Sequence, residues 1–160
     1  MRRLVALLAG LAILAAVNWT VWQRERLVGS GRVVLLELAP VDPRSLMQGD
    51  YMALRFRVAT DAFGPGRAAT EAADGHLVLR LDERGVAELV RLDDGTPLAA
   101  AEVRMRFRVR GGTPKLATNA FFFEEGSAAR YSEARYGEFR VDGNGEAILT
   151  GLRDRELRGL

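Results

Sequence analysis

The chain has 160 residues, enough for one membrane anchor and one compact domain, and its hydrophobic content of 48% is too high for a disordered protein. Arg2 and Arg3 account for the net charge of +2, so the rest of the chain is formally neutral, which argues against nucleic acid as a partner. The absence of cysteine excludes a disulfide framework, a thiolate nucleophile and a zinc–thiolate site.

The first predicted element is a membrane-spanning helix from Leu4 to Trp22, a stretch without any charged residue. At about 1.5 Å per residue it can cross a hydrocarbon core of ~30 Å. Trp19 and Trp22 lie where an interfacial aromatic belt would place them. A cleaved signal peptide and a buried core helix are alternatives, but no clean small-x-small cleavage site follows the stretch. We expect residues 1–26 to be a retained anchor with its flanks, inserted in the lipid bilayer.

The charges at the two ends of this helix predict its orientation. Arg2, Arg3 and the terminal amine precede it, and Arg24, Glu25 and Arg26 follow it. Because basic flanks stay preferentially in the cytoplasm, the sequence favours a single-pass protein of a bacterial inner membrane. Its C-terminal domain is expected to face the periplasm or cell exterior.

After the anchor, residues 27–32 are predicted to form a linker, because Gly29-Ser30-Gly31 is a short flexible break. Residues 33–160 are then expected to form an extracytoplasmic β domain. Its first strand is Val33 to Leu38, and a second, Tyr51 to Val58, alternates apolar residues with others.

The remaining elements also indicate a β domain. The clearest strand is Val103 to Arg110, in which apolar residues alternate with arginines. One helix is expected at Ser127 to Arg135. Two hairpins are predicted, from His76–Leu81 with Val86–Leu92 and from Phe139–Val141 with Ala147–Leu149. The fold class is mainly β, a small barrel or folded antiparallel sheet with one short helix, preceded by a single N-terminal transmembrane helix.

One motif resembles the signature of a known family. Gly49, Asp50, Tyr51 and Leu54 match the signature of the GDYXXLXY family of bacterial membrane-anchored proteins, with Phe56 in place of the final tyrosine. The resemblance implies a membrane anchor and an extracytoplasmic domain without an established activity. Members are often encoded beside multi-spanning membrane proteins, which implies a membrane-protein partner. The candidate interaction residues are Pro43, Ser45, Gly49, Asp50, Tyr51, Leu54 and Phe56.

Two motif residues have alternative interpretations. Asp50 is predicted to cap backbone N–H groups of a turn, with a binding or catalytic acid as the alternative. Tyr51 is typical of sheet packing, with partner contact as the alternative. The segment around Ser45 is also similar to the turn after the nucleophile in type I signal peptidases, but the upstream serine is missing and Lys115, the only lysine, has no pattern around it.

The arginine stripe, defined as Arg104, Arg106, Arg108 and Arg110, is the most notable chemical surface. Four guanidinium groups on one strand face could bind a carboxylated or phosphorylated ligand. The alternative is a solvated face paired with acidic residues of adjacent strands.

No convincing catalytic constellation, metal site or cofactor site is predicted, and the chain has one histidine. The sequence favours a non-enzymatic accessory subunit of a multi-spanning inner-membrane protein. A binding module for an acidic envelope ligand on the arginine stripe is the first alternative, and a hydrolase using Ser45 or Asp50 is the second.

Overall fold

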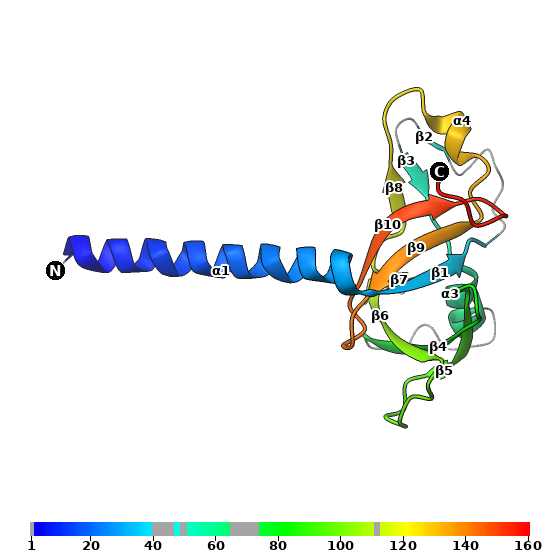
Figure 1. Ribbon diagram of the computed structural model, residues 1–160, viewed down its shortest axis with the longest axis horizontal. Helices are drawn as coiled ribbons and strands as arrows, with labels where there is room; N and C mark the ends of the chain where they lie inside the picture. Colours follow the sequence, from blue (N-terminus) through cyan, green and yellow to red (C-terminus); the bar gives the residue numbers. More distant parts are fainter. Residues whose placement is uncertain (1, 40–46, 49–50, 65–73, 111–112) are drawn as a thin grey trace.

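The computed structural model describes residues 2–39, 47–48, 51–64, 74–110 and 113–160. Its most prominent feature is α1 (Arg2–Ser30), a 29-residue helix that stands away from the β domain (Figure 1). At about 1.5 Å per residue, α1 is about 43 Å long and exceeds the ~30 Å hydrocarbon core of a bilayer. None of its most apolar 18-residue window is buried. The predicted apolar N-terminal helix is confirmed, and this exposure contradicts the alternative of a buried core helix.

The helix extends through most of the segment predicted as a linker. α1 ends at Ser30, and the N–H of Gly31 donates to the carbonyl of Leu27 over 2.9 Å. Leu27 is 7% exposed because this last turn contacts β9 and β10. Burial of Leu27 offsets the poor helix propensity of Gly29. Only Gly31 separates α1 from the first strand.

The first sheet joins the beginning of the domain to its end. β1 (Arg32–Glu37), β9 (Tyr136–Val141) and β10 (Ala147–Arg153) lie in the order β1-β9-β10, and both pairings are antiparallel. The predicted β9–β10 hairpin is confirmed. Its turn is closed by Asp142, whose Oδ1 accepts the N–H groups of Asn144 and Glu146, each over 2.9 Å.

The second sheet contains four strands in the order β5-β4-β6-β7. Their bounds are β4 (Gly75–Leu81), β5 (Ala87–Leu92), β6 (Glu102–Arg110) and β7 (Thr113–Leu116). β4 and β5 form the predicted hairpin. β6 confirms the clearest predicted strand, since its apolar residues point inward: Val103 is 8% exposed, Met105 0% and Phe107 4%.

The third sheet is small and corrects one prediction. β2 (Met47–Gln48), β3 (Tyr51–Ala53) and β8 (Ala120–Phe122) lie in the order β2-β3-β8. The strand predicted from Tyr51 to Val58 is wrong beyond Ala53, because a helix, α3 (Arg57–Phe63), follows a single bridge residue. Val58 and Ala62, one helical turn apart, are both buried, so α3 is stabilised by packing on the core.

The helix predicted from Ser127 to Arg135 is shorter than expected. α4 (Ala128–Tyr131) spans one turn. At the start of α4, the side chain of Ser127 makes no capping hydrogen bond. At its end, the Ser132 N–H donates to the Ala129 carbonyl. Without a side-chain cap or any buried residue, the segment lacks the contacts that would extend it.

One hydrophobic core takes side chains from all three sheets. β1 connects the two larger sheets, because the Leu35 N–H donates to the Gly85 carbonyl over 2.9 Å. The strands are divided among three sheets, so the described residues form a folded antiparallel arrangement and no closed barrel. The mainly β fold is confirmed. The largest fully buried side chains are Phe139, Leu36, Leu54, Leu77, Leu79, Met105, Leu116, Leu152, Val34 and Val78.

Candidate functional site

The described part of the motif lies on the β2-β3-β8 sheet. Tyr51 begins β3 and pairs in register with Phe122 of β8, and their ring centroids lie 5.8 Å apart. Phe122 is 75% exposed, more than any other large hydrophobic side chain in the described chain. The strand pairing therefore builds an aromatic pair with one face open to solvent. Four candidate residues lie outside the described residues: Pro43, Ser45, Gly49 and Asp50.

The last two motif residues face the core. Leu54 is 2% exposed, and its N–H donates to the Asn119 carbonyl over 2.7 Å. Phe56 is 3% exposed and packs edge-to-face on Phe139, with ring centroids 5.3 Å apart. The ring of Phe56 therefore packs in the core. Phenylalanine, unlike the tyrosine of the family signature, has no hydroxyl group that would need a buried hydrogen-bond partner.

The arginine stripe is matched by carboxylates from three other segments. Asp74 precedes β4, Asp93 follows β5, and Glu146 precedes β10. Arg106 shares Glu146 with Arg108, so three carboxylates face four guanidinium groups. The ion pairs are Arg104 Nε to Asp93 Oδ2 at 2.5 Å, Arg106 to Glu146, Arg108 Nη2 to Glu146 Oε1 at 3.8 Å, and Arg110 Nη1 to Asp74 Oδ1 at 3.4 Å.

The family model described as GDYXXLXY protein matches residues 13–152, which include most of α1, the motif strand and nearly all of both larger sheets. The chain belongs to the GDYXXLXY family. No curated protein and no solved structure matches it.

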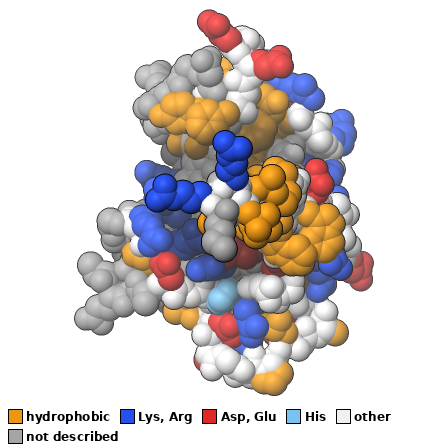
Figure 2. Space-filling model, turned by 90° about the vertical axis from the view of Figure 1, so that its left-hand side faces the viewer, with side chains coloured by type: hydrophobic (Ala, Val, Ile, Leu, Met, Phe, Trp, Pro, Cys, Tyr) orange, Lys and Arg blue, Asp and Glu red, His pale blue; other side chains and the backbone are white. Residues whose placement is uncertain are grey.

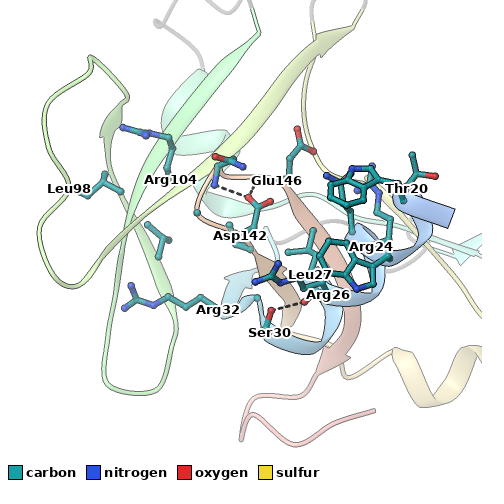
Figure 3. Close-up of a pocket in the computed structure, with 18 of the residues that line it drawn as sticks. Thr20, Arg24, Arg26, Leu27, Ser30, Arg32, Leu98, Arg104, Asp142 and Glu146 are labelled. Carbon is teal, nitrogen blue, oxygen red and sulfur yellow. Dashed lines mark hydrogen bonds between the residues drawn. The ribbon is translucent and has the colours of Figure 1, made fainter. Parts of the chain in front are cut away.

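A wide cleft of this GDYXXLXY domain lies between the end of α1 and the β domain. This cleft, which we call the junction cleft, has a volume of about 1110 Å³. The helix supplies residues from Trp19 to Ser30, and the opposite wall comes from β1, β6 and the β9–β10 turn (Figure 3). Its charged lining residues are Arg24, Arg26, Arg32, Glu102, Arg104, Arg108, Asp142 and Glu146.

Aromatic and cationic side chains are stacked along the helix side of the junction cleft. The rings of Trp19 and Trp22 have centroids 5.2 Å apart. The guanidinium carbon of Arg26 lies 5.3 Å from the Trp22 ring centroid, a cation–π geometry. In the sequence, this wall was indicated by the tryptophans at the end of the predicted span and by the arginines that follow it. Most of the opposite wall could not be predicted, because Arg104 and Arg108 of β6 come near the helix only through the tertiary fold.

Glu102 is an acidic lining residue held by its own neighbours. The N–H of Ala99 donates to its carboxylate over 3.1 Å, and this bond, opposed by burial and aided by Arg91, lowers the pKa of Glu102 below its ordinary value. Its side chain is 7% exposed. Among the described residues, no group of three or more His, Asp or Glu side chains could hold a metal ion.

Proposed function

We propose that this GDYXXLXY protein is a single-pass inner-membrane protein and a non-enzymatic accessory subunit of a multi-spanning membrane protein. The observation that carries the proposal is α1, whose apolar side chains are exposed along a length that exceeds the hydrocarbon core. So large an apolar surface is stable in lipid or against another membrane protein, and it is costly in water.

The exterior location of the domain is supported by charge at the ends of α1. Arg2 and Arg3 lie at the N-terminal end without a nearby acidic residue in the sequence, whereas Glu25 lies between Arg24 and Arg26 at the other end. Because the more basic end of a membrane-spanning helix is preferentially retained in the cytoplasm, this charge difference supports a β domain on the periplasmic side.

The motif sheet supports a protein partner. Tyr51 and the exposed Phe122 form an aromatic pair, and Phe122 also lines a shallow groove of about 330 Å³ whose walls include Phe121, Ile148 and Leu149. Hydrophobic side chains, those of α1 among them, lie on the face of the molecule from which α1 emerges (Figure 2). Exposed aromatic residues are enriched at protein interfaces, where they contribute much of the binding energy. We propose that this groove contacts the partner close to the membrane surface.

The two alternative functions have less support. The ion pairs of the arginine stripe occupy its guanidinium groups, which favours the solvated, cross-paired interpretation over an acidic-ligand site. Ser45 and Asp50, the residues of the hydrolase alternative, lie outside the described residues. Partner binding through the groove is therefore the function that the geometry supports best.

The test is affinity purification of the tagged full-length protein from detergent-solubilised membranes of its own host, followed by mass spectrometry. We expect a stoichiometric multi-spanning membrane protein with the wild type and with Leu92→Ser, a control on β5 that is 48% exposed. Phe122→Ser is expected to lose that partner. Recovery of the wild type alone contradicts the accessory role. An alkaline phosphatase fused to the C-terminus is expected to be active, and an inactive fusion contradicts the orientation.

A further inference from the structure

The junction cleft has a surplus of positive charge once internal pairs are assigned. Asp142 accepts backbone N–H groups of its own turn, Glu102 is held by Ala99 and Arg91, and Glu146 pairs with arginines of the stripe. Its three acidic lining residues are therefore already engaged.

Three of the lining arginines have no carboxylate partner among the described residues. Arg24 makes no ion pair there, Arg26 stacks on Trp22, and Arg32 donates only to the Glu102 carbonyl, over 3.5 Å. Guanidinium groups that line a concave site and have no carboxylate partner of their own suit an anion with several oxygen acceptors, such as a phosphate.

The position of Arg24 and Arg26 along α1 indicates that the anion belongs to a lipid headgroup. Arg24 and Arg26 lie about 3 Å and about 6 Å beyond Trp22 along the helix axis. The headgroup layer on each side of a bilayer is roughly 5–8 Å thick, and tryptophan belts lie at the level of the headgroups. The two arginines therefore lie at phosphate depth in a protein that spans the bilayer through α1.

We propose that the junction cleft binds the headgroup phosphate of an anionic glycerophospholipid. Arg24, Arg26 and Arg32 supply the positive charge that attracts the phosphate, and the acyl chains lie along the exposed apolar surface of α1 next to Trp19. The proposal rests on the membrane anchoring proposed above. It adds a bound lipid that orients the domain on the bilayer surface.

The experiment uses the full-length protein purified in a non-ionic detergent. The cleft variant Arg24→Gln/Arg26→Gln/Arg32→Gln is compared with Arg84→Gln/Arg130→Gln/Arg155→Gln, a control with the same charge change at exposed arginines that do not line the junction cleft. Native mass spectrometry follows titrations with phosphatidylglycerol, phosphatidylcholine and inorganic phosphate. Melting temperatures show whether each variant is folded.

We expect the wild type and the control to bind phosphatidylglycerol in preference to phosphatidylcholine. The cleft variant should need roughly tenfold more phosphatidylglycerol or worse, because each arginine at an anionic surface adds to the attraction. If the triple variant unfolds, Arg24→Gln/Arg26→Gln keeps the Arg32 hydrogen bond and is expected to show the same direction of change.

Three results would overturn the proposal. They are equal binding by the cleft variant and the wild type, equal losses in the cleft variant and the control, and displacement of phosphatidylglycerol by millimolar phosphate, which would indicate a free-anion site. Lipid binding is read on the purified protein, whereas the accessory role is read from the co-purified partner. Failure of one is therefore distinguishable from failure of the other.

Discussion

Replacing Gly31 by alanine tests the direct connection between α1 and β1. A Cβ at this position would lie 2.5 Å from the Leu27 carbonyl oxygen and 3.1 Å from Arg140 Cβ. Because the closest atom belongs to the backbone, the last turn of α1 must shift, and Leu27 must leave part of its buried site. Overpacking of this kind costs about 1–3 kcal/mol. In a chain of this size the melting temperature then falls by roughly 2–4 °C per kcal/mol.

Gly29→Ala is the matched control for this substitution. Gly29 also lies at the end of the helix, but a Cβ there would point into open space, with no contact within 4 Å. Alanine there improves helix propensity by roughly 0.5–1 kcal/mol, so the melting temperature should stay the same or rise slightly. Both variants are measured by circular dichroism of the full-length protein in detergent. Equal melting temperatures for Gly31→Ala and Gly29→Ala would refute the close packing at Gly31 that connects α1 directly to β1.

Two further predictions concern the stability of the domain. Phe139→Ala should cost about 3–5 kcal/mol in chemical denaturation, because Phe139 is fully buried against Phe56, whereas Phe122→Ala should stay within about 0.5 kcal/mol. Acid should also destabilise the domain. Hydrogen bonds from the Thr96 hydroxyl and N–H lower the pKa of Asp94 to about 2, and the pKa of Asp82 is lowered chiefly by the Val86 N–H. Since these folded-state pKa values are depressed, their stabilisation is complete above about pH 4 and is lost as the pH falls towards 2. Melting temperatures should fall across that range, less steeply in Asp94→Asn, and a flat wild-type profile would contradict this reasoning.

Strong local patterns predicted the larger elements. Alternation along β6 indicated both its strand character and its inward face, because a strand with one buried face repeats every two residues. α1 was evident from its uncharged length. The pairing of β1 with β9 was not predictable, since it depends on contacts across most of the chain.

The failed strand prediction has a local physical cause. Leu54, Phe56 and Val58 are all buried, as alternation indicated, but the chain turns helical at Arg57 and Val58 reaches the core from α3. In a seven-residue helix, too few positions are present to distinguish a helical period from a strand period. The junction cleft was missed for another reason, since its two walls come from segments that only the tertiary fold brings together.

Because a single residue separates α1 from β1, a rotation or tilt of the helix is transmitted to the β domain. Each residue added within α1 before Leu27 would turn the domain by about 100° around the helix axis and displace it by about 1.5 Å. In a protein inserted through α1, a neighbouring helix that rotates or tilts this one would therefore swing Phe122 and the arginine stripe through a large arc. In the proposed membrane-anchored arrangement, the rotation of α1 about its own axis would set the direction in which the domain faces.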